Sequence, residues 1–360
     1  MANLKILAFG AGAIGTYIGG SLALAGEQLV FLERPEIAEE LHKRGLRLDL
    51  TLDKRRNTKE AYVLSPASFV VASTLEEALR YGPFDVAIFA LKSFDTADAA
   101  EGLKPFVEKL PPFLCFSNGV DNEPMLAKVL GENKVIPGTV THSIGRRGAG
   151  DIVLERMRGI GIASTNPLSS KLIIASNSAF LNARPYSNPV AMKWSKMMTN
   201  LTANPISAIL DITAGEVFAN PKLFRLEMAL VHECIAVMKA QGIPLVDLPD
   251  APVRFLALVT RLPIWLSRPL LAGAAGSARG SKMPSFHIDL YAGRGKSEVE
   301  FLHGAVVRAG EKYGVPTPVN KVLSETVAAL FKKEIPLDAY AHQPEKLLAK
   351  VQEAENESKE

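Results

Sequence analysis

The sequence predicts an α/β protein in which a doubly wound, mostly parallel sheet is followed by an all-helical domain. Over the first half of the 360 residues, short apolar runs alternate with helix-like segments, as is typical of a parallel sheet covered by helices. The first run leads straight into a glycine-rich turn, and from Pro189 onward long helical patterns replace the strands. We therefore expect two domains that meet near residues 187–190.

The N-terminal domain, residues 1–187, is defined by its buried strands and the helices between them. Each strand is a short apolar run bounded by turn residues, and each helix follows a strand. We expect strands at 4–9, 28–32, 85–91 and 113–117, and helices at 13–25 and 36–45. The stretch 134–187 is mixed, with short β-like runs such as Lys171–Ala175.

The second domain, residues 188–340, reads as helices. Helical patterns cover 190–211, 221–241, 296–313 and 319–332. The stretch 244–284 is rich in Pro, Arg and Gly, which indicates an insertion within this domain. The tail, 341–360, is charged and poor in apolar residues, which favours a frayed helix or disorder.

Arginines recur every seven residues in the insertion, at Arg254, Arg261 and Arg268, among large apolar side chains. Pro263 and Pro269 disfavour one straight helix, so we expect two short helices with a proline joint. Four roles stay open for them: an added helical layer on the domain, a subunit interface, contact with a membrane surface, or a lid.

Composition excludes several classes of protein. The net charge is +3 and we find no basic stripe with interleaved aromatic residues, so we expect no nucleic-acid partner. Glycines break the N-terminal apolar run, unlike a secretory signal, and no run reaches the roughly 18 residues of a membrane span. We expect a cytoplasmic protein and disfavour membrane contact, which stays open only as one of the roles of the insertion. Cys115 and Cys234 are expected to be core thiols, and no bound metal is expected.

The first strand runs into Gly10-Ala-Gly12-Ala-Ile-Gly15, a G-x-G-x-x-G turn that opens a helix. In this context the first glycine allows the tight turn, the second lets a pyrophosphate approach, and the third lets helix and strand pack closely. The free amides at the start of the helix attract phosphate. The pattern predicts a Rossmann-type dinucleotide site whose cofactor contacts include Gly10, Gly12, Ala13, Ile14 and Gly15.

Two charged residues follow the second strand and bear on the cofactor. An acid there bonds the ribose hydroxyls of NAD, whereas an arginine accepts the 2′-phosphate of NADP. The sequence has both, Glu33 and Arg34. Because the guanidinium fork matches a phosphate so well, Arg34 favours NADP, and Glu33 leaves NAD open.

Polar residues also follow two later strands. Ligands of parallel sheets bind beyond the carboxyl ends of the strands. Lys92 and Asn118 stand at such ends, so we expect them to reach the cofactor or the substrate, with an ordinary loop role as the alternative.

Lys196, Asn200 and Asn204 are spaced four residues apart, so on a helix they share one face. Asparagine is a poor helix former, so two at this spacing point to a site for a carbonyl and a carboxylate, with a solvated face as the alternative. Further on, Ser285 and Asp289 are also four apart, and Glu298 opens another helix. The alternative for Glu298 is a purely structural role, because acidic residues are favourable near the start of a helix.

Taken together, these segments resemble the ketopantoate reductase family, in order, over about residues 4–330. The resemblance rests on AGAIG, Lys92, SNGV, KWSKMMTNLTANP and PSFHID…GRGKSEVEFLHG. It implies a Rossmann domain, a helical domain, a site between them, and reduction of 2-ketopantoate to pantoate by NADPH. The long insertion departs from the well-known members.

The resemblance also implies roles for individual residues. Lys196 matches the catalytic lysine, and Glu298 matches the glutamate paired with the chemistry. Substrate contacts are implied for Asn200, Asn204, Ser285 and Asp289, and cofactor contacts for Lys92 and Asn118. A growing oxyanion on the ketone would be stabilised and protonated by the lysine.

Alternatives remain at the level of sequence. A related two-domain dehydrogenase could act on another 2-keto or 3-hydroxy acid, and a silent NAD(P) sensor would bind cofactor without turnover. The expected partner is a small 2-keto acid, and a homodimer is left open.

Overall fold

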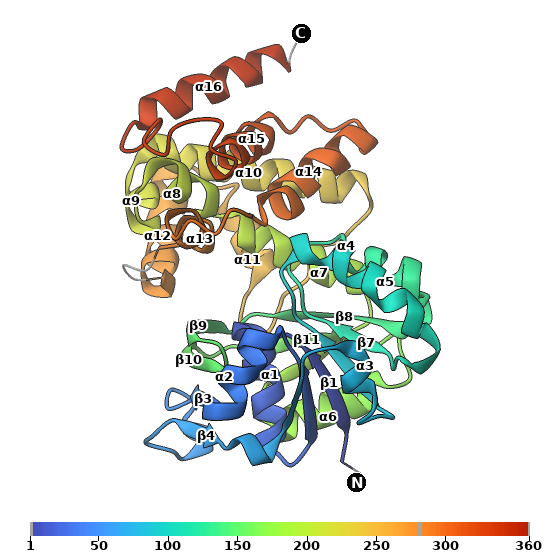
Figure 1. Cartoon of the computed structure of the whole chain (residues 1–360). Helices are drawn as coiled ribbons and strands as arrows, with labels where there is room; N and C mark the ends of the chain where they lie inside the picture. Colours follow the sequence, from blue (N-terminus) through green and yellow to red (C-terminus); the bar gives the residue numbers. More distant parts are fainter. Residues whose placement is uncertain (1–2, 280–282, 359–360) are drawn as a thin grey trace. The chain divides into compact units, whose positions relative to one another are not determined.

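The computed structural model describes residues 3–279 and 283–358, and the side chains of 272–279 are not described. The chain forms two compact units: Met1–Lys193 with Leu248–Ala251, and Trp194–Asp247 with Pro252–Glu360. The predicted fold class is confirmed, since the first unit holds a parallel-dominated sheet with helices and the second is helical (Figure 1). Residues 280–282 of the expected insertion and 359–360 of the tail lie outside the described part.

The main sheet contains all four predicted strands next to one another. Its order in the described residues is β12-β11-β8-β7-β6-β1-β2-β5. Neighbours from β5 to β8 are parallel, β11 is antiparallel to β8, and β12 is parallel to β11. The bounds are β1 (Lys5–Phe9), β2 (Gln28–Leu32), β5 (Val70–Ala72), β6 (Val86–Phe89), β7 (Phe113–Cys115), β8 (Val135–Val140), β11 (Ile160–Ala163) and β12 (Ala183–Tyr186).

Both faces of this sheet are buried, which explains the continuous apolar character of its strands. In β1, Ile6 and Ala8 belong to one apolar core, and Leu7 and Phe9 belong to the core on the opposite face. The helices of this unit are α1 (Ala13–Leu24), α2 (Pro35–Arg44), α3 (Leu75–Leu79), α4 (Thr96–Leu103), α5 (Asn122–Leu130) and α6 (Ser169–Ser178). Cys115 and Cys234 are buried and unpaired, as predicted.

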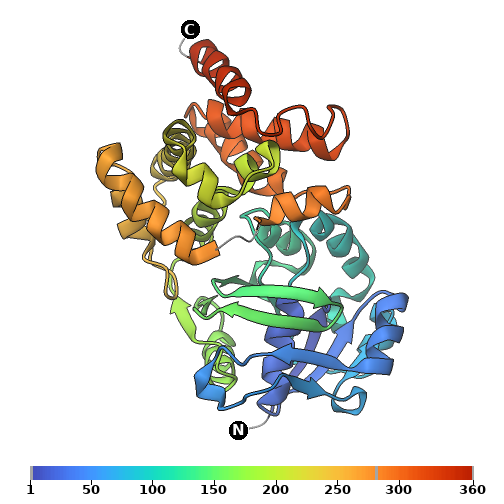
Figure 2. The same cartoon turned by 90° about the vertical axis from the view of Figure 1, so that its left-hand side faces the viewer.

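A smaller sheet was not predicted. Its order is β4-β3-β10-β9, and Figure 2 shows its blue and green strands side by side. The strands are β3 (Leu46–Asp49), β4 (Tyr62–Leu64), β9 (Ser143–Gly148) and β10 (Asp151–Arg156). β3 and β10, about a hundred residues apart in the chain, pair in parallel.

The prediction of a β-like run at Lys171–Ala175 is wrong, because these residues lie inside α6. Leu172 and Ala175 are buried against the sheet, while Ile174 is exposed. The apolar residues of this run therefore follow a helical period around one buried face, and their β-branched character did not decide the structure.

Four residues from the middle of the chain, Leu248–Ala251, complete the first unit as a clip. Thr141 Oγ1 donates to the Pro249 carbonyl at 2.8 Å. Asp250 accepts from Asn182 Nδ2 at 3.3 Å and pairs with Arg184 at the same distance. This clip therefore fastens to segments that precede it by 66 residues or more.

The second unit consists of helices from α8 onward, and α7 begins in the first unit and ends in the second. The bounds are α7 (Pro189–Leu201), α8 (Asn204–Leu210), α9 (Ala214–Ala219), α10 (Pro221–Ala240), α11 (Val253–Val259), α12 (Ile264–Arg279), α13 (Ser285–Tyr291), α14 (Val299–Tyr313), α15 (Pro318–Phe331) and α16 (Pro344–Glu357). None of the helices in the described residues combines the length and apolar character that a membrane span requires.

The helix expected over 190–211 is in fact two helices, α7 and α8. Ala203 adopts a left-handed conformation (φ +58°) that ends the helical path between them. Its amide donates to the buried carboxylate of Glu227 on α10, with an N–O distance of 2.8 Å. A buried acceptor supplied from another helix thus stabilises this break, and Pro205 in the first turn of α8 is compatible with a new helix starting there.

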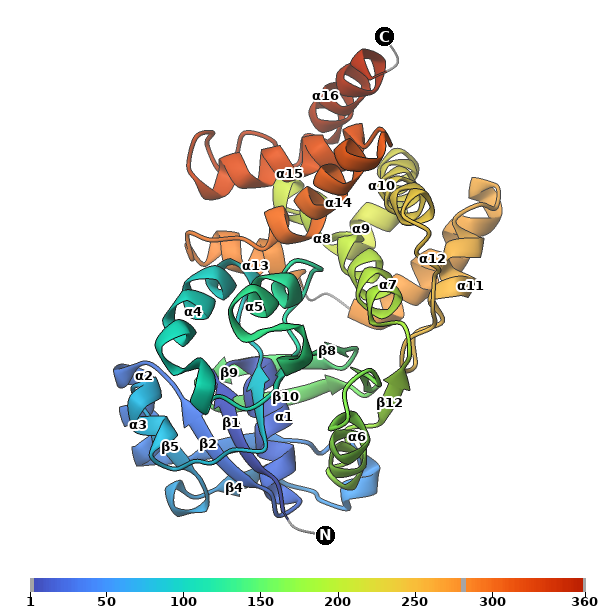
Figure 3. The same cartoon turned by 90° about the vertical axis from the view of Figure 1, so that its right-hand side faces the viewer.

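The described part of 244–284 forms two helices, α11 and α12, as predicted (Figure 3). Pro263 lies between them, whereas Pro269, which was also expected to disfavour a straight helix, lies inside α12. Val259 and Leu271 pack into a core with Phe218 and Phe224, so the inner face is a helical layer on this unit. The outer face keeps large apolar groups in solvent: the exposed fractions are 56% for Phe255, 58% for Leu258 and 75% for Trp265.

The charged tail contains a regular helix, α16, where fraying or disorder was expected. Leu347 and Val351, four residues apart, are buried. Two apolar side chains on one helical face are thus enough to dock an otherwise charged segment.

Candidate active site

The glycine turn has the geometry that a dinucleotide needs. Gly10 adopts φ +88°, and a Cβ built at Gly15 would lie 2.0 Å from the Gly10 carbonyl oxygen. At Gly12, in contrast, an added Cβ would meet nothing within 4 Å, so the backbone there is open to a ligand. Within the described residues no side chain caps α1 and its first turn has no acid, which leaves the amides of Ala13 and Ile14 to an anion. These residues fit a bound pyrophosphate.

Glu33 and Arg34 stand where β2 ends, and their side chains differ in position. The half-buried Glu33 carboxylate turns toward the glycine turn and accepts a hydrogen bond from the Ala11 amide at 2.5 Å. Its second oxygen accepts from the Arg34 amide at 3.1 Å. Arg34 is exposed at the start of α2.

The two later loops are bonded to one another. Ser117 Oγ donates to the Leu91 carbonyl at 2.8 Å, and Ser93 Oγ donates to the Asn118 carbonyl at 2.7 Å. Lys92 is the residue that precedes a short 3₁₀ turn, Ser93–Asp95. The structure therefore places Lys92 and Asn118 on adjacent, mutually fixed loops beyond β6 and β7.

In the second unit, four of the predicted residues form one row of contacts. Lys196 Nζ donates to Asn200 Oδ1 at 2.8 Å. Asn204 Nδ2 donates to the Asn200 carbonyl at 3.4 Å and to Ser285 Oγ at 3.2 Å. Asn204 Oδ1 accepts from the Phe286 amide at 3.0 Å, which ties the start of α13 to α8.

Asp289 and Glu298 are both buried but lie in different settings. Asp289, on α13, pairs with Arg294 at 2.6 Å. Glu298 is the residue that precedes α14, and its carbonyl accepts the amide of Leu302 at 3.1 Å. This position at the start of a helix is compatible with both roles considered for Glu298, a catalytic one and a purely structural one.

Lys193 is a residue that the sequence analysis missed. Lys193 is buried, as are its neighbours in sequence, Met192 and Trp194. Its ammonium contacts the carbonyls of Ser117 and Gly138 and the carboxylate of Glu123. One signal was available: Lys193 stands seven residues before Asn200, so it extends the polar face of α7 by one turn.

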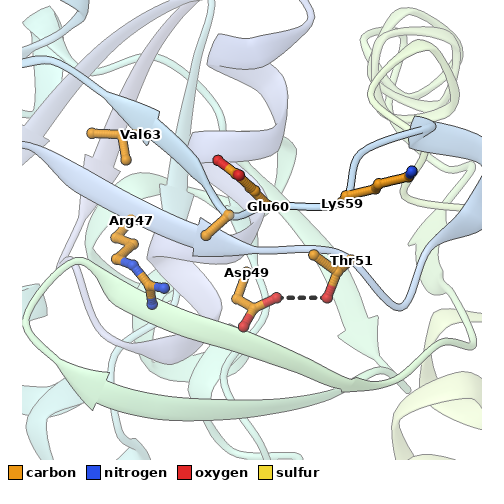
Figure 4. Close-up of a pocket in the computed structure, with 7 residues that line it drawn as sticks. Arg47, Asp49, Thr51, Lys59, Glu60 and Val63 are labelled. Atoms are coloured by element: carbon orange, nitrogen blue, oxygen red, sulfur yellow. Dashed lines mark hydrogen bonds between the residues drawn. The ribbon is translucent and has the colours of Figure 1, made fainter.

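A separate pocket of about 510 Å³ lies on the smaller sheet (Figure 4). Asp49 accepts from Thr51 Oγ1 at 2.8 Å and pairs with Arg147 at 3.1 Å. The hydrogen bond from Thr51, with Arg147 as a lesser contribution, holds the pKa of Asp49 below its usual value. The pocket contains none of the predicted site residues; it is lined by Arg47, Asp49, Thr51, Lys59, Glu60, Ala61 and Val63.

A dinucleotide-type glycine turn on a doubly wound sheet, joined to a helical unit with a lysine–amide row, defines a class of two-domain oxidoreductases. The chain belongs to the ketopantoate reductase PanE/ApbA family. Residues 6–167 match the model of that family, and 188–331 match the model of its C-terminal domain. The resemblance seen in the sequence is confirmed, and a nicotinamide cofactor is implied by the family.

Curated relatives and solved structures agree with this assignment. A 2-dehydropantoate 2-reductase of Archaeoglobus fulgidus is 28% identical over 328 residues, which cover 90% of this chain and 96% of that protein. A crystal structure of a ketopantoate reductase of this family from Ralstonia eutropha has a TM-score of 0.75 at 25% identity and covers 92% of this chain and 99% of that one. D-Mandelate dehydrogenase with NADH and anilino(oxo)acetate shares the fold (TM-score 0.72, 21% identity, 92% and 99% coverage).

Proposed function

We propose that the chain reduces the ketone of a small 2-keto acid to the 2-hydroxy acid, with 2-dehydropantoate as substrate and pantoate as product. This is a step of pantothenate biosynthesis, which we place in the cytoplasm. The observation that carries the proposal is the row Lys196–Asn200–Asn204–Ser285, because a cation and neutral donors held in line suit an oxyanion and a carboxylate.

The reaction needs a proton donor beside the ketone oxygen. When bound, the reduced nicotinamide supplies a hydride to C2 of the keto acid. Negative charge then grows on the ketone oxygen, where the Lys196 ammonium stabilises it and donates the proton. Asn200 accepts one of the ammonium hydrogens at 2.8 Å, which restrains the orientation of the ammonium. Glu298 is proposed to orient the lysine or the new hydroxyl.

The substrate carboxylate needs neutral donors. Ser285 Oγ is exposed at the start of α13, where it can donate to an incoming carboxylate. Asn204 holds this serine by its side-chain amide and caps the same helix through the Phe286 amide. Asp289, paired with Arg294, is proposed to keep α13 in place beneath the substrate.

Cofactor choice is a separate part of the proposal. We propose NADPH, because the Arg34 guanidinium is exposed beside the end of β2 and suits a 2′-phosphate. NADH is the second candidate, favoured by the Glu33 carboxylate: its bond to the Ala11 amide places it beside the turn, where it would accept from ribose hydroxyls and repel a phosphate.

The test is oxidation of NADPH and NADH with a panel of 2-keto acids that includes 2-dehydropantoate. We expect turnover with 2-dehydropantoate above that with pyruvate, 2-ketoisovalerate and phenylglyoxylate. A different preferred acid would overturn the substrate and leave the reaction class standing. Cofactor binding without turnover of any acid would instead make the chain a sensor.

A further inference from the structure

Lys193 is a buried lysine that the proposed chemistry does not use, and it contacts two carbonyls and a carboxylate. The residue is 6% exposed, and its Nζ lies 2.6 Å from the Ser117 carbonyl, 3.3 Å from the Gly138 carbonyl and 2.7 Å from Glu123 Oε1. The ammonium donates to the two carbonyls and forms an ion pair with the carboxylate. Glu123 is itself only 8% exposed. Because a buried pair seldom adds net stability over an apolar pair, this arrangement calls for another explanation.

The loop that Lys193 holds is one of the two predicted cofactor loops. Ser117 follows β7, and its hydroxyl bonds the Leu91 carbonyl of the neighbouring loop. The sheet order β2-β1-β6-β7 gives the direction of the cofactor: the adenosine ribose belongs at β2 and the pyrophosphate at β1. The nicotinamide half must then lie beyond β1, at the loops after β6 and β7.

The same lysine belongs to the helix that carries the proposed proton donor. Lys193 stands on the second turn of α7, and Lys196 follows three residues later on that helix. At a rise of about 1.5 Å per residue, the two residues are about 4.5 Å apart along the helix axis. Fixing Lys193 thus fixes the rotation and height of the turn from which Lys196 extends.

We propose that Lys193 is a positioning residue, which holds the Ser117–Gly119 loop against the nicotinamide and fixes the turn of α7 that precedes Lys196. Glu123 serves as its counter-charge. This inference rests on the proposed reductase function. The role proposed for Lys193 is to set the geometry of hydride transfer, which is distinct from a role in folding.

The experiment compares variants that separate geometry from charge burial. Lys193→Met with Glu123→Leu removes the pair without leaving a lone buried charge, so the protein should fold. Glu123→Gln keeps the lysine and its two carbonyl contacts. The matched control, Lys222→Met with Glu345→Leu, removes an exposed pair 2.8 Å long elsewhere.

Hydride transfer is measured in a single turnover, as a rate per folded molecule that a mere loss of stability would not lower. We expect the Lys193/Glu123 double variant to be about 10- to 100-fold slower, as misplacement on the order of an ångström produces. The Lys222/Glu345 control should stay within about threefold of wild type, a difference of under about 1 kcal/mol. Glu123→Gln, which keeps the two carbonyl contacts of Lys193, should be slowed less than the double variant. A folded double variant that transfers hydride at the wild-type rate would overturn the proposal.

Binding gives a second readout that needs no turnover. The double variant should bind the reduced nicotinamide cofactor about fivefold or more weakly, a loss of about 1 kcal/mol. Its affinity for the matching ADP-ribose fragment, which lacks nicotinamide, should be unchanged. Equal loss for both ligands, or loss for neither, contradicts the proposal. If the wild type binds cofactor but reduces no 2-keto acid, the proposed reaction fails while this comparison still decides the role of Lys193.

Discussion

At the scale of single residues, the buried His303 makes the stability of the folded protein depend on pH. It is fully buried, and Nδ1 donates to Asn320 Oδ1 at 2.8 Å. Asn320 Nδ2 in turn donates to Glu233 Oε2 at 2.7 Å. Burial lowers the pKa of His303 to about 4, against an ordinary value near 6.5. The neutral imidazole is therefore part of the folded state.

The stability of the helical unit should fall as the pH drops from about 6.5 to about 4, because in this window only the unfolded histidine binds a proton. A shift of this size corresponds to roughly 3 to 3.5 kcal/mol at the low-pH end of the window. Urea unfolding at several pH values measures the loss. His303→Asn should reduce the slope, whereas His142 of the first unit, with its pKa also lowered to about 4 by burial, still contributes to the pH dependence of the whole chain. An unchanged slope in the variant would contradict this account.

Lys196→Ala should cut turnover by two orders of magnitude or more, in line with the loss of an oxyanion donor. Cofactor affinity should stay the same, because the row that contains Lys196 is built on α7, α8 and α13. The matched control is Lys239→Ala, at an exposed lysine of α10. Near-normal turnover of the Lys196 variant in a steady-state assay would remove this residue from the proposed mechanism.

Arg34→Ala should weaken NADPH about tenfold or more and leave NADH almost unchanged, since the 2′-phosphate would lose its guanidinium partner. Isothermal titration with both cofactors measures the two affinities. Glu33→Gln is the counterpart: it removes the carboxylate charge beside the Ala11 amide and should favour NADPH further. If wild type prefers NADH and Glu33→Gln abolishes that preference, the carboxylate selects the cofactor and the NADPH proposal is wrong.

At the scale of elements, the glycine turn separates folding from binding. Gly12→Ala should fold with a normal melting temperature, because its Cβ would meet nothing within 4 Å, yet bind cofactor about tenfold or more weakly by blocking the pyrophosphate. Gly15→Ala should lower the melting temperature, because its Cβ would collide with the Gly10 carbonyl. Thermal unfolding with and without cofactor checks both. Equal melting temperatures for the two variants would show that the turn yields more easily than we infer.

The elements also show what the sequence could and could not predict. Strands such as β1 and β6 are buried on both faces, so they appear in the sequence as continuous apolar runs and could be predicted from it. The α7–α8 break was not predicted: the left-handed Ala203 is held by the distant Glu227, and Pro205 in the first turn of α8 is a local signal that the expected continuous helix left out of account. The smaller sheet was missed for the same reason, since β3 pairs with β10 far along the chain.

The arrangement of the candidate site could also be predicted only in part. Helical spacing was enough to group Lys196, Asn200 and Asn204, and the contact with Ser285 then follows from α8 meeting α13. Lys193 was missed because a lysine normally indicates solvent, and its burial depends on acceptors in three other segments. Which residues α13 and α14 bring to the row is likewise a tertiary property.

At the scale of the whole molecule, the outer face of α11 and α12 is the feature most exposed to association. Three large exposed apolar side chains on these two helices, Phe255, Leu258 and the 75% exposed Trp265, favour contact with other apolar surfaces. We expect the sedimentation coefficient of wild type to rise with concentration. Replacing Phe255, Leu258 and Trp265 with serine should suppress that rise and change stability by less than about 0.5 kcal/mol. Concentration-independent sedimentation of the wild type would mean that this face is simply solvated.

The clip Leu248–Ala251 has a consequence for how the protein is made. A ribosome must synthesise the first 251 residues before the Thr141 hydroxyl and Asp250 can take their places, although the last strand of the main sheet ends at Tyr186. A nascent chain of intermediate length therefore carries an unfinished first unit, whose apolar strands are open to aggregation and to chaperones. Translation pauses or truncations between residues 193 and 248 should be the most damaging to yield, and a first unit expressed alone should need the clip supplied as a fused segment.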